Sequence, residues 1–271
     1  MKAIDRLKLS SVVLKKAREL GADIAGIANF KEVKGCPSAK AELKLPQMEA
    51  LKEEDSFESG KAYLPEEGRS VILVAISHPE EEPELDWRYD RYSTPGNQKL
   101  VAMVNNLIKW LKKNYEGLET YHAPYFIEKG GIYLKDAAVM AGLGTIGLNN
   151  LLITPEYGPR VRLRGLVVNV ELVSTGPLAY DPCFNCERYC LQDCPRRVFD
   201  EIIYTSEEMG QDKLPGRRGT YDRMKCLKEI DRDKERAREG DVKAFHKTTG
   251  QMIYLIKHCR KCEFSCPVGL V

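Results

Sequence analysis

The chain has 271 residues, of which 43% are hydrophobic, enough for one large domain or two smaller domains with a buried core. Its 42 basic residues nearly balance its 40 acidic residues, so the net charge of +2 gives no general indication of nucleic-acid binding. No apolar run approaches the roughly 18 residues of a membrane span, and the first ten residues contain no apolar signal segment. These features predict a soluble cytoplasmic protein.

The first part of the sequence alternates between helical and strand-like patterns. Apolar residues recur at helical spacing from Leu9 to Leu20, and Gly21 follows as a stop signal. Residues 22–30 and 71–77 then form apolar runs that are typical of buried strands. A helix followed by buried strands indicates a mixed domain with its own core.

A longer helix is expected after the turn signal at residues 94–96, with Asn97 as its cap, because apolar residues mark one face from Leu100 to Leu111. A short helix of small residues is expected over 134–141, and a strand over 161–173 closes this half. Residues 1–177 are therefore predicted to form an α/β domain.

One glycine-rich turn, residues 142–147, matches the G-x-G-x-x-G fingerprint of dinucleotide-binding sites. That fingerprint needs a strand before it and a helix after it. Here the order is reversed, because a helical pattern precedes the glycines and a strand pattern follows them. The order argues against a nicotinamide cofactor, but the glycines still indicate that the backbone closely approaches a ligand or the next strand.

The sequence changes character over residues 178–271, which are rich in cysteine, proline and charge. Two long inserts flank Cys226. The insert at 205–220 is expected to be a loop, whereas residues 229–240 are expected to form a solvated helix because charges of both signs alternate along them.

Eight of the nine cysteines lie in this second half, in a pattern typical of ferredoxins that hold two [4Fe-4S] clusters. Bacterial ferredoxins repeat C-x2-C-x2-C-x3-C-P twice, and the fourth cysteine of each run binds the other cluster. Here the first run is one residue longer, and the second run lacks its leading cysteine, which Cys226 can supply. The count gives four thiolates per cluster, and thiolate suits the soft iron of a cluster.

The crossover rule assigns these eight cysteines to two clusters. One set is Cys183, Cys186, Cys190 and Cys266. The other set is Cys194, Cys226, Cys259 and Cys262. Zinc ribbons also use paired cysteines but do not explain two C-x3-C-P endings, and disulfide frameworks are typical of short secreted chains. The ninth thiol, Cys36, is isolated and is expected to be structural.

Residues 126–167 carry a resemblance to a known family. This stretch, FIEKGGIYLKDAAVMAGLGTIGLNNLLITPEYGPRVRLRGLV, followed by the two cysteine groups, resembles the epoxyqueuosine reductase and reductive dehalogenase superfamily. Residues 22–30 and 69–79 also resemble the N-terminal domain of that family. The resemblance implies an α+β protein, in which an α/β domain that binds cobalamin with its lower base detached is followed by a ferredoxin-like domain. No D-x-H-x-x-G sequence occurs, so histidine-on binding of cobalamin is not indicated.

The resemblance also implies site residues. The acid that donates a proton in epoxyqueuosine reductases falls on Glu128, where that family has aspartate, and a family glutamate falls on Leu134, which is a departure. The shared turn and the positions that line the corrin in the family fall on Gly142, Gly144, Asn149, Leu152 and Leu163.

The implied function is that of an iron–sulfur oxidoreductase that passes electrons from two [4Fe-4S] clusters to bound cobalamin for a reductive reaction, with Glu128 as the catalytic acid. The alternative is an electron carrier that uses clusters alone, or a reductase of a partner corrinoid protein. A ferredoxin or flavodoxin of low potential is the expected electron donor. The expected substrate is a small molecule or a corrinoid protein.

The sequence makes transfer RNA a less favoured candidate for the substrate. Epoxyqueuosine reductases usually continue after the second cluster into a helical-repeat region that helps to hold transfer RNA, whereas this sequence ends at Val271. Basic residues near Cys226 could replace that region, although solvated charge is the simpler explanation. They are Arg217, Arg218, Arg223 and Lys225.

Overall fold

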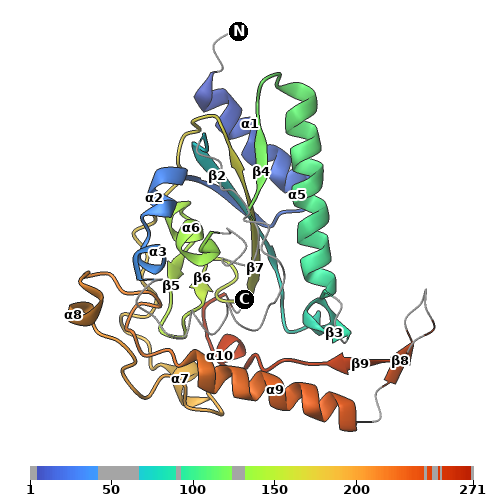
Figure 1. The fold of residues 1–271 in the computed structure, drawn as a ribbon, viewed down its shortest axis with the longest axis vertical. Coiled ribbons are helices and arrows are strands. Elements are labelled where there is room, and N and C mark those ends of the chain that lie inside the picture. Colours follow the sequence, from blue (N-terminus) through green and yellow to red (C-terminus); the bar gives the residue numbers. More distant parts are fainter. Residues whose placement is uncertain are drawn as a thin grey trace.

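The computed structural model describes residues 5–41, 67–89, 93–123, 132–240, 243–245, 250 and 252–269. An antiparallel four-stranded sheet forms the centre of the first half, with helices on both of its faces (Figure 1). In sheet order its strands are β1 (Ile24–Asn29), β2 (Ser70–Ser77), β7 (Val161–Val168) and β4 (Thr120–His122).

Helices cover both faces of this sheet. One face packs against α1 (Arg6–Glu19) and α5 (Pro95–Asn114). The other packs against α2 (Phe30–Lys34) and α6 (Leu134–Met140), with α3 (Pro37–Ala41) beside them. The mixed α/β architecture expected from the sequence is confirmed.

The position of the central strand β2 between two cores explains its apolar sequence. Ile72 and Val74 point to the core beneath α1 and α5, whereas Val71 and Leu73 point to the core beneath α6. All four side chains are fully buried. A sheet that is covered on both faces needs apolar residues at consecutive positions, even though its strands are antiparallel.

The N-cap of the long helix α5 lies three residues before the expected cap. The Thr94 hydroxyl accepts a hydrogen bond from the backbone N–H of Asn97 at 3.2 Å, and Pro95 occupies the first helical turn. Thr94 is therefore the N-cap, and the prediction of Asn97 is wrong. A hydroxyl before the first turn can reach a free N–H group, whereas Asn97 already lies within that turn.

The glycine-rich stretch follows α6 and contains β5 (Thr145–Ile146), which pairs with β6 (Leu152–Ile153) in a small hairpin. The stretch is thus preceded by a helix and followed by a strand. This confirms the reversed order that argued against a dinucleotide fingerprint.

The cysteine-rich half lies at one end of the sheet domain (Figure 1). Its apolar core, within the described residues, is a small cluster around Tyr204 and Met209. Its elements are α7 (Tyr189–Gln192), α8 (Ser206–Met209), α9 (Arg223–Glu239), β8 (Lys243–Phe245), β9 (Met252–Ile256) and α10 (Lys261–Phe264).

The two halves share a second sheet. Strand β3 (Arg88–Tyr89), which follows the short helix η2 (Pro83–Asp86), pairs with β9, and β9 pairs with β8. Helix α9 confirms the solvated helix that alternating charges predicted. The loop predicted over residues 205–220 is wrong in part, because Thr205 and Glu208 form a capping box that begins α8. In the part of the chain that is described, no helix is long and apolar enough to cross a membrane.

Candidate iron–sulfur site

The first group of cysteines surrounds one cavity beneath the β5–β6 hairpin. Cys190 lies on α7, and Cys266 follows α10, which packs against α7. Burial, and then the charges of Cys266, Cys183 and Cys186, raise the pKa of Cys190 to about 12. All four thiols line this cavity: Cys183, Cys186, Cys190 and Cys266.

The second group surrounds a neighbouring pocket of about 300 Å³. Cys226 lies on the first turn of α9, and Cys262 lies on α10. Burial and then the charges of the other three thiols raise the pKa of Cys262. The four thiols that line this pocket are Cys194, Cys226, Cys259 and Cys262.

These two sets are the sets that the crossover rule gives. Cys194 and Cys266, each of which precedes a proline, lie with the cysteines of the other run. Four neighbouring thiols that ionise together repel one another unless a cation lies among them. Among the described residues, no three His, Cys, Asp or Glu side chains converge closely enough for a single metal ion. Two separate groups of four thiols are the arrangement that two [4Fe-4S] clusters would need.

Asn149 joins the hairpin to both cavities, because it lines each of them. Its side chain is buried, with 3% of its surface exposed. Its Nδ2 donates to the carbonyl oxygen of Cys262 at 3.0 Å, and its Oδ1 accepts from the backbone N–H of Leu151 at 3.2 Å. Asn149 therefore fixes α10 to the sheet domain.

Arg160 holds the other end of α10. This arginine is buried, and its Nη1 donates to the carbonyl oxygen of Cys266 at 3.0 Å. Its Nη2 also donates to the carbonyl oxygen of Val268. The carbonyl oxygen of Glu263 accepts from the same guanidinium at 3.4 Å. Arg160, directly before β7, thereby binds three backbone carbonyls between residues 263 and 268.

A buried ionic network connects the sheet domain to α10. Asp86 lies 2.9 Å from His78 Nδ1, 3.0 Å from Arg162 Nε and 2.7 Å from Arg260 Nη1. Burial alone would raise the pKa of Asp86, but the hydrogen bond from His78 and the charges of the two arginines hold it below its usual value. Glu263 of α10 completes the network with both arginines.

Sequence analysis missed this network and Arg160. The available signal is the alternation of arginine with apolar residues along β7, where Arg162 and Arg164 interrupt an otherwise apolar strand. Their partners are distant in sequence, since Arg162 contacts a residue 101 positions away. Spacing along the chain alone therefore could not identify them.

The glycines of the predicted corrin contacts are explained by packing within the chain. A side chain at Gly144 would lie 2.1 Å from the carbonyl oxygen of Ile153, and one at Gly142 would lie 2.6 Å from that of Thr175. Gly142 also has a φ of 70°, in the left-handed region that favours glycine. Both glycines are needed for backbone approach within the chain, and their role toward a corrin stays a prediction.

The other predicted corrin and catalytic residues are spread over several places. Leu152 is buried in the core beneath α6, and Leu163 is partly buried against the same core. Asn149 lies apart from them, at the cavities. Glu128 lies outside the described residues. Leu134, where the sequence departs from the family, packs against the α6 core.

Cys36 lies outside both cysteine-lined cavities. It is fully buried, and its sulfur accepts a hydrogen bond from the N–H of Ala39 at 3.4 Å. Burial and the charge of Asp136 raise the pKa of this thiol to about 12. These surroundings favour the structural role that was expected.

The basic residues near Cys226 differ in what they contact. Arg217 pairs with Asp181 at 2.5 Å, and Lys225 pairs with Glu201 at 2.8 Å. Arg218 is exposed, whereas Arg223 lines the second cysteine pocket. The four side chains therefore do not form one free basic surface.

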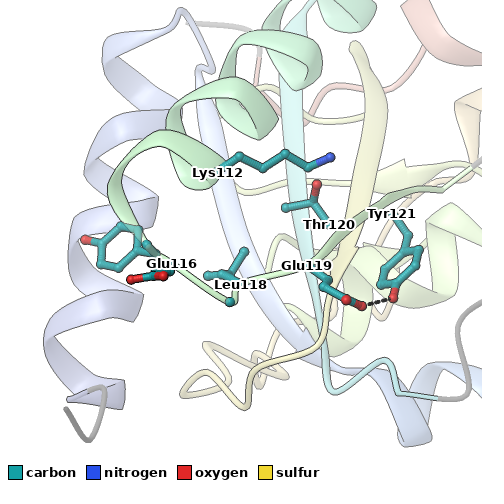
Figure 2. A pocket seen from close by; sticks show the side chains of 8 residues that line it. Lys112, Glu116, Leu118, Glu119, Thr120 and Tyr121 are labelled. Carbon is teal, nitrogen blue, oxygen red and sulfur yellow. Dashed lines mark hydrogen bonds between the residues drawn. The ribbon is translucent and has the colours of Figure 1, made fainter. Parts of the chain in front are cut away.

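A separate surface hollow of about 520 Å³ lies at the other end of the sheet domain, where α5 leads into β4 (Figures 1 and 2). Figure 2 shows Tyr121 donating a hydrogen bond to Glu119 at its edge. That bond raises the pKa of Tyr121 to about 12. The hollow contains none of the predicted site residues.

Comparison with known proteins shows that the chain is similar to two kinds of reductase. No protein-family model matches it. It is 24% identical over 277 residues to epoxyqueuosine reductase of Cyclobacterium marinum, covering 96% of this chain and 79% of that one. It is 26% identical over 229 residues to tetrachloroethene reductive dehalogenase of Desulfitobacterium hafniense, covering 70% and 38%.

Solved structures agree with these relatives. Epoxyqueuosine reductase of Streptococcus thermophilus matches with a TM-score of 0.63 and 21% identity, over 97% of this chain and 66% of that one. An epoxyqueuosine reductase with a modified tRNA stem loop matches with a TM-score of 0.58 and 17% identity, over 97% and 65%. A reductive dehalogenase for which a B12-dependent mechanism was suggested matches with a TM-score of 0.53 and 16% identity, over 84% and 30%. At these identities the likeness shows the fold.

The chain spans only part of several relatives. It is 30% identical to epoxyqueuosine reductase of Lactococcus garvieae over 140 residues, which are 39% of that protein. These comparisons support the mixed α/β fold of this chain, whereas the activity of the longer proteins does not transfer directly.

Proposed function

Because the chain is similar to epoxyqueuosine reductases and reductive dehalogenases, we propose that it is an oxidoreductase that holds two [4Fe-4S] clusters and passes their electrons to bound cobalamin. The observation that carries this proposal is the division of eight cysteines into two groups of four around neighbouring cavities. A disulfide framework or a single zinc ion would not require this division.

The two cavities are suited to electron transfer between clusters. Asn149 forms part of the wall of both, so the clusters would lie on either side of one side chain. Leu148 and Ile153 of the sheet domain line the first cavity. The first cluster would thus lie directly against the domain that is proposed to hold the corrin.

The proposal of cobalamin rests on the family. When bound, cobalamin would supply a reduced cobalt that acts as a nucleophile or an electron donor. Of the described contact candidates, Leu163 is partly exposed, whereas Leu152 is buried and the amide of Asn149 is already hydrogen bonded within the chain. The carboxyl group of Glu128 would hold the proton that the reaction delivers to the leaving oxygen or the product carbon.

The proposed partners follow from the same chemistry. A ferredoxin or flavodoxin of low potential would supply single electrons to the clusters. The proposed substrate is a small molecule or the corrinoid of a partner protein. Transfer RNA is the alternative, since a related enzyme was solved with a tRNA stem loop. Equilibrium binding of an unmodified tRNA anticodon stem loop, measured at two salt concentrations, separates specific from general electrostatic binding.

A cluster-only electron carrier is the second candidate function, because none of the described corrin candidates needs a corrin to explain its position. Anaerobic purification after supply of cobalamin separates the two candidates. A bound corrin adds visible absorption that differs from the broad charge-transfer bands of iron–sulfur clusters. Cluster absorption alone, under saturating cobalamin, would favour the electron carrier.

The role of Glu128 is tested by Glu128→Gln, which keeps the size of the side chain but cannot deliver a proton. With an identified substrate, turnover should fall by about 10²- to 10⁴-fold, while reduction of the clusters continues. Glu80→Gln, at an exposed position, is the matched control. Turnover of Glu128→Gln within a factor of about three of wild type would exclude this glutamate as the acid, because that factor is below 1 kcal/mol.

A further inference from the structure

The second cysteine pocket has an unusual charge distribution. Two of its basic side chains are compensated, because Arg196 pairs with Glu229 at 2.5 Å and Arg260 pairs with Asp86 and Glu263. The basic side chains that line this pocket are Lys135, Arg196, Arg223 and Arg260. The charges of the other two, Lys135 and Arg223, are not compensated by these ion pairs.

Lys135 and Arg223 have no carboxylate partner in an ion pair within the described residues. The Nζ of Lys135 donates to the carbonyl oxygen of Asn150 at 2.6 Å, which satisfies a hydrogen bond but not a charge. The two cations are close enough to affect each other. Burial, with a smaller contribution from the charge of Arg223, lowers the pKa of Lys135 to about 8 against the opposing charge of Asp136.

Two like charges at one pocket are unfavourable unless an anion lies between them. The same pocket presents four thiols, and a [4Fe-4S] cluster bound by four thiolates carries a net negative charge. Reduction by one electron adds one further negative charge to the cluster. A nearby cation therefore stabilises the reduced form more than the oxidised form, and raises the reduction potential.

The first cavity offers a contrast. Its one basic lining residue is Arg188, whose side chain is exposed and therefore screened by water. A second cation, Arg160, is buried beside this cavity, and its charge acts on Cys266. Its guanidinium donates to backbone carbonyls, including that of Cys266, and does not line the cavity. Unlike the second pocket, the first cavity has no basic residue that is both partly buried and part of its wall.

We propose that Lys135 and Arg223 form a cation pair that specifically raises the reduction potential of the second cluster, the one assigned to Cys194, Cys226, Cys259 and Cys262. This proposal rests on the proposed function, because it requires that cluster to be present. One electron from an external reductant would enter the second cluster, whose added negative charge the two cations stabilise. The residues act on the cluster through charge and do not contact the substrate.

The test is a potentiometric titration of the anaerobic holoprotein with dithionite, followed by electron paramagnetic resonance. Lys135→Met and Arg223→Gln remove one charge each and should shift the potential of one cluster to more negative values, leaving the other cluster unchanged. The variant Cys226→Ser identifies which signal belongs to the second cluster. Lys228→Gln removes an exposed charge from the same helix as Arg223 and should change neither potential.

Unchanged potentials for both clusters in Lys135→Met and Arg223→Gln would overturn the proposal. If Arg223→Gln loses the second cluster, Arg223→Lys must keep it at nearly the wild-type potential, since it keeps the charge. Loss of the cluster in both Arg223 variants would show that the pocket needs the shape of the arginine side chain and not its charge. Wild-type protein that binds no second cluster would instead contradict the proposed function, so the two failures are distinguishable.

Discussion

The two halves of the molecule are stabilised in different ways. The sheet half has an extensive apolar core on each face of its sheet, built around β2 and β7. The described part of the cysteine half has a small cluster around Tyr204 and Met209. Burial of apolar surface can stabilise the sheet half. The cysteine half buries too little apolar surface, so its stability must depend on cluster ligation and on ion pairs to the sheet half.

The largest expected effect is the loss of the cysteine half when its clusters are removed. Hydrogen exchange of the apoprotein, prepared anaerobically with a chelator, should show lost protection over residues 183–194 and 259–266. Strands β2 and β7 should keep their protection, because their apolar cores do not involve the cysteines. The lost stabilisation should be on the order of 10 kcal/mol, the scale of structural metal sites in small domains.

Equal exchange in both halves of the apoprotein would contradict this comparison, because it would mean that the whole chain folds as one unit. Unchanged protection of residues 183–194 would contradict it in the opposite sense, because the cysteine half would then be stable without its ligands.

A second, smaller effect concerns the ionic network between the halves. Asp86→Asn removes the carboxylate that His78, Arg162 and Arg260 share, and it leaves Glu263 as the one carboxylate of the network for two buried arginines. The free energy of unfolding of the holoprotein in urea should fall by about 3–5 kcal/mol. Cluster content should be measured in parallel, since Arg260 and Glu263 also line the second pocket.

The matched control is a surface ion pair of the sheet half. Glu171 pairs with Arg6, and both side chains are more than half exposed, at 54% and 60%. Glu171→Gln should therefore change the free energy of unfolding by less than about 1 kcal/mol. Equal destabilisation of Asp86→Asn and Glu171→Gln would contradict this prediction, because the Asp86 network would then contribute no more than a surface ion pair.

The smallest effect tests the helix that covers the sheet half. Thr94→Ala removes the hydroxyl that caps α5 and should lower the free energy of unfolding by about 1 kcal/mol in urea denaturation. Thr94→Ser keeps the hydroxyl and should be nearly neutral. A larger loss for Thr94→Ser than for Thr94→Ala would show that the methyl group, and not the cap, stabilises this turn.

Much of the sheet half was predictable because its signals are local. The apolar run at 71–77 and the helical spacing from Leu100 to Leu111 correspond to β2 and α5. The cap of α5 was assigned to the wrong residue, since Thr94 and Asn97 are both good capping residues. The short helix α8 was missed because four residues are too few for a periodic signal.

The candidate site was predictable only where the spacing of residues along the chain identifies the ligands. Cysteine spacing gave both groups of four, which line separate cavities in the structure. It could not give Arg160, Asp86 or Lys135, whose contacts join segments far apart in the sequence. The glycines of residues 142–147 were assigned to a corrin, although packing within the chain already accounts for Gly142 and Gly144.

The most direct test of the central claim is the iron and acid-labile sulfide content of anaerobically prepared protein. Two [4Fe-4S] clusters predict about eight irons and eight sulfides per chain. Cys226→Ser should lose about half of the iron, whereas Cys36→Ala should keep it all, because Cys36 lines neither cysteine cavity. Stoichiometric zinc without sulfide, or equal loss of iron in the two variants, would contradict the account.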